Sequence, residues 1–149
     1  MEKLAVERSV WIAAPRERAW RAVTEPEQLD RWYATYYRWE ISALQEGATV
    51  KFYNKDDVTD MQLATIEVID PPRQFTLRWQ PDPEYPATTL VTTFILEEEN
   101  GGTRVTISES GYETLPDDQR QKWLEATAKG YTMSMENLKA HVEGRSLPF

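Results

Sequence analysis

The last third of the chain holds the feature that most limits the fold, a long amphipathic segment from Pro116 to Val142. Apolar or small side chains recur there at steps of three or four residues, which is the period of one helix face. Pro116 and the two aspartates after it favour a helix start, and Gly144 is a typical stop. Such a helix of about 27 residues would be about 40 Å long. Because no second segment is long enough to pair with it as a bundle, we expect a sheet to cover its apolar face.

The rest of the chain reads mainly as strands separated by turn residues. Residues 6–12 alternate between the two faces of a strand, and Pro15 and Pro26 each suit the first turn of a short helix. Six further strands are predicted at residues 35–41, 49–54, 61–69, 74–80, 88–96 and 103–110. A turn at residues 97–102 is predicted to join the last two strands. Because strands and helices are segregated, we expect one α+β domain over residues 1–149, with an antiparallel sheet that curls around the terminal helix.

Composition excludes several kinds of chemistry. The chain has no cysteine and a single histidine, His141, so it offers no disulfide or thiolate and little material for a zinc site or a Ser-His-Asp triad. A net charge of −8 without a cluster of Lys and Arg argues against nucleic acid and anionic membranes as partners. No apolar run approaches the roughly 18 residues of a membrane span, and the first residues lack the apolar core of a signal peptide. We therefore expect a cytoplasmic protein without metal or cofactor, and an exposed His141.

An ordered set of short motifs resembles a known family. The segment VERSVWIAAPRERAWRAVTEPEQLDRWY at residues 6–33 is followed by VIDPPR at 68–73, GTRVTI at 102–107 and SGY at 110–112. Together these motifs are similar to the family named after the activator of the ninety-kilodalton heat-shock-protein ATPase. That family belongs to the START-like, birch-pollen-allergen-like superfamily, also called SRPBCC. Tyr131 stands where the family usually has Trp, which could reshape a pocket.

The resemblance implies a helix-grip fold for the whole chain. In that fold a curved antiparallel sheet of six to seven strands surrounds a long C-terminal helix, and two short helices follow the first strand. Proteins of this superfamily often hold an apolar cavity between the sheet and the helix. The sequence leaves the oligomeric state open between a monomer and a homodimer. The resemblance implies a chaperone as an alternative partner to a small molecule.

Aromatic residues are unusually frequent, with six Trp and seven Tyr, and they suit the walls of such a cavity. Thr127, Gly130 and Ser134 are small or polar on the inward stripe of the helix, where a packed core would favour Leu or Ile. Small residues opposite large rings leave room for a ligand. The alternative is that the rings only fill the core. The predicted ligand-binding residues are Trp32, Tyr36, Phe52, Trp79, Glu109, Trp123, Thr127, Tyr131 and Ser134; the wider aromatic set adds Tyr33, Tyr37, Trp39 and Phe75.

Glu109 is the charge of most interest, because it continues the face of Val105 and Ile107 that we expect to point inward. A carboxylate in that position needs an arginine, a tyrosine or a water as its partner. Arg8 and Arg78 are the candidate arginines. A general acid or base role is one interpretation of Glu109. A rim glutamate or a satisfied ion pair is the other.

From these observations we expect a module that binds a small hydrophobic or aromatic ligand between helix and sheet, and we assign no catalytic residue. An enzyme that resembles the polyketide cyclases and aromatases of the superfamily, with Glu109 and a tyrosine as its acid and base, is the first alternative. A chaperone-partner domain with a role in the stress response, as the family name implies, is the second.

Overall fold

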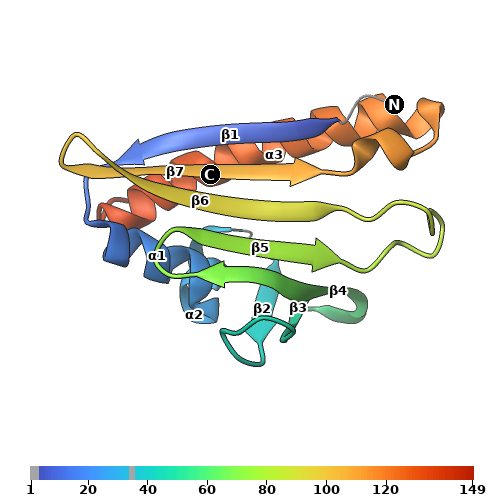
Figure 1. The fold of residues 1–149 in the computed structure, drawn as a ribbon, viewed down its shortest axis with the longest axis horizontal. Coiled ribbons are helices and arrows are strands. Elements are labelled where there is room, and N and C mark those ends of the chain that lie inside the picture. Colours follow the sequence, from blue (N-terminus) through green and yellow to red (C-terminus); the bar gives the residue numbers. More distant parts are fainter. Residues whose placement is uncertain (1–3, 34–35) are drawn as a thin grey trace.

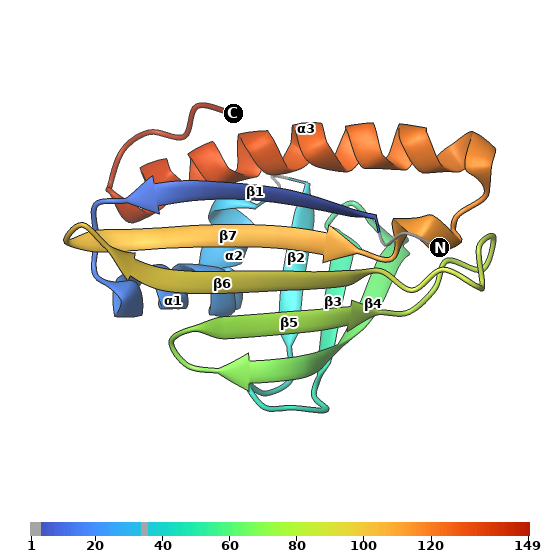
Figure 2. The same cartoon turned by 45° about the horizontal axis from the view of Figure 1, so that its top comes forward.

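The computed structural model describes residues 4–33 and 36–149. Within these residues, seven strands pair in one antiparallel sheet in the order β1-β7-β6-β5-β4-β3-β2. The sheet is unclosed, with β1 and β2 at its edges, and it curves so that β2 and β3 run steeply across the direction of β1 and β7 (Figure 2). The strands are β1 (Ala5–Ile12), β2 (Tyr37–Ile41), β3 (Thr49–Asn54), β4 (Asp57–Asp70), β5 (Gln74–Trp79), β6 (Val91–Glu99) and β7 (Gly102–Ser110).

The helices stand where the prolines and the long amphipathic stripe predict them. α1 (Arg16–Thr24) follows Pro15, and α2 (Pro26–Trp32) begins at its proline. A short 3-10 turn, η1 (Tyr112–Thr114), leads into α3 (Asp117–Val142), which is capped by Pro116. α3 lies along one face of the sheet, beside β1 (Figures 1 and 2). The predicted α+β helix-grip fold, with its two short helices after the first strand, is therefore confirmed.

The predicted turn at 97–102 is present but shorter than predicted, because the β6–β7 ladder continues until Glu99 pairs with Gly102. Only Asn100 and Gly101 remain in the turn, and both have positive φ, 49° and 78°. A two-residue turn of this kind follows the natural twist of a hairpin. Glu97 and Glu98 are exposed on the ladder, so their charges do not end the strand. Elsewhere β4 begins four residues earlier than predicted, at Asp57, and residue 35 of the predicted strand 35–41 lies outside the described residues.

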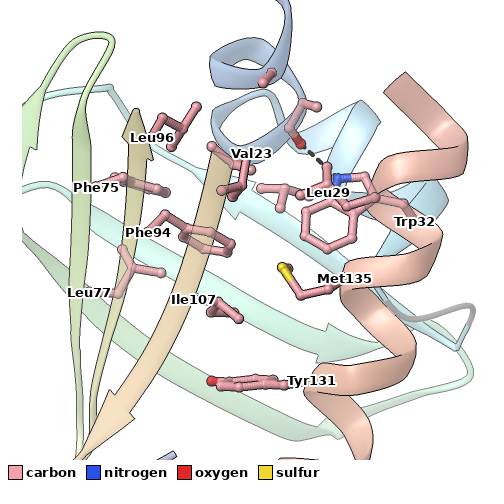
Figure 3. Close-up of a cluster of buried hydrophobic side chains, with 14 of the residues drawn as sticks. Val23, Leu29, Trp32, Phe75, Leu77, Phe94, Leu96, Ile107, Tyr131 and Met135 are labelled. Carbon is pink, nitrogen blue, oxygen red and sulfur yellow. Dashed lines mark hydrogen bonds between the residues drawn. The ribbon is translucent and has the colours of Figure 1, made fainter. Parts of the chain in front are cut away.

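A packed core joins α1, α2 and the C-terminal half of α3 to the sheet. Figure 3 shows Leu29 and Trp32 of α2 pointing toward Phe94 of β6, with Met135 of α3 beside them. The Trp32 indole N–H donates to the Ala22 carbonyl oxygen over 2.8 Å, so this ring is satisfied without water. No helix in the described part of the chain combines the length and the apolar character needed to cross a bilayer.

The N-terminal half of α3 contacts the sheet differently. None of the described residues of α3 before Tyr131 is buried, whereas Tyr131, Met135 and Leu138 all are. The inward side chains of the helix are therefore fully buried against the sheet only over its second half. The first half packs more loosely, through the half-buried Trp123, Leu124 and Ala128, and the candidate site lies between it and the far strands of the sheet.

Candidate functional site

A cleft of about 670 Å³ opens between the first half of α3 and the far strands of the sheet. Its floor and walls come from β2 to β5, from β7 and from the loop between β5 and β6, so the curvature of the sheet shapes it. The lining residues are Tyr33, Trp39, Phe52, Met61, Gln62, Leu63, Trp79, Gln80, Pro81, Asp82, Pro83, Tyr85, Thr88, Leu90, Glu109, Trp123, Thr127, Gly130, Tyr131 and Ser134.

The structure brings most of the predicted ligand-binding residues together at this cleft. They come from β3, β5, β7 and α3, which are distant in sequence. Gly130 lines the cleft as well, and a Cβ at this position would meet no atom within 4 Å. The predicted residues that line the cleft are Phe52, Trp79, Glu109, Trp123, Thr127, Tyr131 and Ser134.

Two predicted residues, Trp32 and Tyr36, lie away from the cleft. Trp32 is 1% exposed in the packed core, with its ring 6.4 Å from that of Phe94. Tyr36 is 66% exposed, and the Lys55 ammonium lies 5.9 Å from its ring centroid. The reason is geometric: α2 turns Trp32 toward the core and the next residue, Tyr33, toward the cleft, while Tyr36 precedes β2 and lies outside its alternation.

Aromatic rings form two opposed parts of the cleft wall. On one side Tyr33, Trp39 and Phe52 pack together, with Trp39 centroids 5.1 Å from Tyr33 and 4.8 Å from Phe52. On the other side Tyr85 of the β5–β6 loop meets Trp123 of α3 edge-on, with centroids 5.4 Å apart. The indole N–H of Trp39 is buried and has no hydrogen-bond partner among the described residues. A buried donor in that state costs about 1–3 kcal/mol.

Glu109 lies at the centre of a hydroxyl network. The Tyr112 hydroxyl donates to its Oε1 over 2.6 Å, and the Thr92 hydroxyl donates to its Oε2 over 2.7 Å. The Tyr131 hydroxyl lies 3.1 Å from the same Oε2. Thr92 is the cross-strand neighbour of Glu109 and in turn accepts the Trp79 indole N–H over 2.9 Å. The network thus joins β5, β6, β7, η1 and α3.

Tyr112 links this network to the helix that borders the cleft. Its hydroxyl oxygen also lies 2.7 Å from Thr127 Oγ1. A phenol has one proton, and an ionised carboxylate can only accept, so Tyr112 donates to Glu109 and the Thr127 hydroxyl donates to Tyr112. Gly111, with φ of 109°, lets the chain leave β7 and place Tyr112 there. A Cβ at Gly111 would come within 2.2 Å of the Thr89 carbonyl oxygen.

The tyrosines around Glu109 stay protonated at neutral pH. Burial, and then the negative charge of Glu109, raise the pKa of both Tyr112 and Tyr33 well above the usual range. Burial raises the pKa of Tyr131 as well, with Tyr33 and Glu109 adding to the shift. A phenol in this state is a hydrogen-bond donor and not a base. Any proton-accepting group in the network is therefore the Glu109 carboxylate.

The arginine partners predicted for Glu109 are wrong. Arg8 lies exposed at the edge strand β1, where its Nε donates to the Thr132 hydroxyl over 3.1 Å. Arg78 alternates to the other face of β5 and pairs with Glu67 over 2.7 Å. The partners are instead two tyrosines, Tyr112 and the predicted site residue Tyr131, and a threonine, Thr92. Thr92 and Tyr112 were missed because strand register and the turn at Gly111 place them, and neither is visible as a spacing pattern.

His141, the single histidine, lies against the short helices and does not line the cleft. The His141 Nε2 lies 3.2 Å from the Gln28 Oε1, so this residue is half-buried against the short helices and not exposed as predicted. Burial, with the charges of Arg18 and Arg31, lowers the pKa of His141. No group of three or more potential metal ligands occurs among the described residues.

Comparison with known proteins places the chain in a family. The family model described as "Activator of Hsp90 ATPase homolog 1-like protein" matches residues 13–143. No curated protein matches the sequence significantly. Protein MLL2253 from Mesorhizobium loti has a similar crystal structure, with a TM-score of 0.77 at 22% identity, and the match covers 98% of this chain and 100% of that one.

Two further structures extend the comparison. The Aha1 dimer from Colwellia psychrerythraea has a TM-score of 0.72 at 19% identity, with 94% of this chain and 96% of that one covered. DynU16, described as a protein in the dynemicin biosynthetic locus, also has a TM-score of 0.72, at 18% identity, with 97% of this chain and 49% of that one covered. At these identities the structures establish a shared fold. Since the family model spans most of its length, the chain belongs to the activator of Hsp90 ATPase homolog 1-like family.

Proposed function

We propose that this chain binds a small molecule with an aromatic or apolar body in the cleft beside the first half of α3. The observation that carries the proposal is an open volume of about 670 Å³ lined by aromatic rings from both the sheet and the helix. Volumes of about 300–1,000 Å³ with mostly apolar walls and a few polar groups are usual for small-molecule sites. The polar groups include Glu109, with its hydroxyl network, and the side chains of Gln62 and Gln80.

The helix side of the cleft supports the proposal because it is built from small residues. Thr127, Gly130 and Ser134 leave space where larger side chains would close the volume. Apolar burial contributes about 25 cal/mol per Å² before ordering costs, so covering about 300 Å² of a ligand would contribute about 7 kcal/mol. Without any ordering cost this contribution would correspond to a dissociation constant of about 10 µM, so the polar contacts of the cleft must add to it for micromolar binding.

Titration with the neutral fluorescent probe N-phenyl-1-naphthylamine tests the proposal. Gly130→Leu places a side chain in the open volume and should weaken probe binding at least about tenfold, while leaving the fold intact. The matched control is Ala126→Leu, which adds the same side chain on the exposed side of α3 and should leave affinity unchanged. Trp123→Ala should also weaken binding. Equal affinity in all of these variants would show that the probe binds elsewhere and would reject the proposal.

A second candidate function is acid–base catalysis on the bound molecule. The observation that favours it is a carboxylate, Glu109, that lines the cleft and is hydrogen-bonded to Tyr112 over 2.6 Å. A structural relative from a biosynthetic locus, DynU16, is compatible with this candidate. Native mass spectrometry of the purified protein would identify a co-purified molecule. If the protein catalyses exchange of that molecule's carbon-bound hydrogens in heavy water and Glu109→Gln does not, catalysis is supported; exchange at the uncatalysed rate would reject it.

The chaperone-partner and homodimer predictions rest on relatives. The family description names an activator of the Hsp90 ATPase, and the Colwellia protein is described as a dimer. Both stay predictions for this chain. Light scattering on the purified protein would distinguish a monomer from a homodimer.

A further inference from the structure

The charged side chains that line the cleft all carry the same sign. Among the described lining residues these are Glu109 and Asp82, and no Lys, Arg or His stands with them. Glu109 lies half-buried on the inner face of β7, whereas Asp82 is exposed in the loop at the cleft rim. A cleft lined by one sign of charge against low-dielectric walls concentrates the electric field and attracts the opposite charge. A ligand suited to this cleft is therefore expected to carry a positive charge.

The charge of Glu109 is satisfied by hydrogen bonds but not neutralised. Its donors are the hydroxyls of Thr92, Tyr112 and Tyr131, all of which are neutral groups. None of the ion pairs between described residues includes Glu109. A carboxylate offers about four acceptor positions, so one position on Oε1 stays open beside the three hydroxyls. A cationic group could occupy it and would meet little screening from solvent.

The aromatic walls favour the same kind of ligand. Trp79 lies next to Glu109 through the shared Thr92 hydroxyl, and Trp123 borders the cleft from the helix. Indole faces attract ammonium groups, and a desolvated setting strengthens that attraction. An anion would be repelled by Glu109 and would find no lysine or arginine among the described lining residues. A neutral molecule without a hydrogen-bond donor would gain nothing from the carboxylate that a hydrocarbon wall could not supply, and a neutral donor would lack the charge attraction.

We propose that the cleft selects an organic cation, an ammonium group on an aromatic or apolar body, with its positive charge beside Glu109 and Trp79. This inference rests on the proposed function, because it names the chemical class of the molecule that occupies the same cleft. It requires no catalysis, and it explains why a carboxylate without a cationic partner stands on an otherwise mostly apolar and aromatic surface.

Three probes of matched shape test the inference by displacement of N-phenyl-1-naphthylamine. They are the cation (1-naphthylmethyl)trimethylammonium, its neutral carbon isostere 1-neopentylnaphthalene, and the anion 1-naphthylmethanesulfonate. We expect the cation to bind at least about tenfold more tightly than the neutral isostere, and the anion to bind most weakly. In Glu109→Gln the preference for the cation should fall to within about twofold. The matched control is Glu97→Gln, which removes the same charge at an exposed position of β6 and should keep the preference.

The outcomes separate the two proposals. If the neutral isostere binds as tightly as the cation to the wild-type protein, the inference is overturned while the proposed function stands. If neither the fluorescent probe nor any of the three compounds binds, both fall. Should circular dichroism show that Glu109→Gln is unfolded, the ranking of the three compounds on the wild-type protein still decides. Asp82→Asn, a change in an exposed loop, should then reduce the preference for the cation only slightly, because solvent screens that charge.

Discussion

The two halves of α3 differ in what they contact, although one continuous helix forms both. From Tyr131 to Val142 the inward stripe carries Met135 and Leu138, which are buried in the core. From Asp117 to Gly130 the inward side carries Trp123 and Leu124, which are only half-buried, beside the small residues Thr127 and Gly130, and none of the described residues there is buried. The difference shows that the helical period decides which face turns inward, whereas the small side chains of Thr127 and Gly130 leave an open volume between that face and the far strands of the sheet.

The largest expected effect is in the packed half. Leu138→Ala should lower the free energy of unfolding by about 3 kcal/mol, because Leu138 is fully buried and its removal leaves a cavity. Urea denaturation followed by tryptophan fluorescence measures this. The control is Leu124→Ala, the same substitution at a half-buried position of the first half, which should cost about 1 kcal/mol. Equal losses of unfolding free energy at the two positions would show that the two halves of α3 are packed equally tightly.

The second effect concerns the C-terminal end of the packed half, where Glu143 ties α3 to the end of β1. Its carboxylate accepts the Ala13 amide over 2.9 Å and the Lys139 ammonium over 3.0 Å. The Ala13 amide, and then Arg145 and Lys139, lower its pKa from 4.5 to about 2. A lowered folded-state pKa means that the stabilisation is complete above pH 4.5 and is lost as the pH falls through about 2.

Glu143→Gln should therefore cost about 1–2 kcal/mol at neutral pH, after a discount for solvent screening. The gap between the two proteins should narrow as the pH is lowered from about 5 to 2. Unfolding measured at several pH values checks this. A gap that is independent of pH would mean that the carboxylate charge contributes nothing.

The third effect has the opposite sign and belongs to the open half. Gly130→Ala should raise the free energy of unfolding by about 0.5–1 kcal/mol, since alanine is the better helix former and its Cβ meets no neighbour here. Ala126→Gly, at an exposed position of the same helix, should lower the free energy of unfolding by a similar amount. It therefore serves as the reference for the effect of helix propensity alone. Thermal unfolding measures both. A destabilised Gly130→Ala would show that the cleft wall is closed at this point.

The smallest effect is expected at the boundary between the halves. Ser134 lines the cleft and is 8% exposed. Ser134→Ala should change the free energy of unfolding by no more than about 0.5 kcal/mol, because alanine is the better helix former and few side-chain atoms are removed. Denaturant unfolding measures it. A loss above about 1 kcal/mol would reveal a hydroxyl partner that the packed side of the boundary supplies.

Much of the fold follows from the sequence because its periodicity is strong. The long stripe predicts α3 to within a residue, and the alternation of apolar side chains predicts most of the strands. The Glu97–Glu98 pair misled the turn prediction, because charges on the exposed face of a hairpin resemble those of a loop. The boundary of β4 was missed for a similar reason, since Asp57 and Asp60 are polar residues in an exposed ladder.

The candidate site follows from the sequence only in part. The small residues Thr127, Gly130 and Ser134 on an inward stripe predict an opening, and they do line the cleft. Periodicity identifies only the buried face of a short helix. It therefore cannot tell which of the neighbouring residues Trp32 and Tyr33 points into the core and which lines the cleft. Thr92 becomes a partner of Glu109 only through the register of β6 and β7, which is a tertiary property.

The separation along α3 has an evolutionary consequence. Because no described residue of α3 before Tyr131 is buried, substitutions there cost less stability than substitutions in the remainder of the helix. Proteins with this architecture could therefore change the ligand that the cleft binds by substitutions in the first half of α3, while the second half keeps its packing against the sheet.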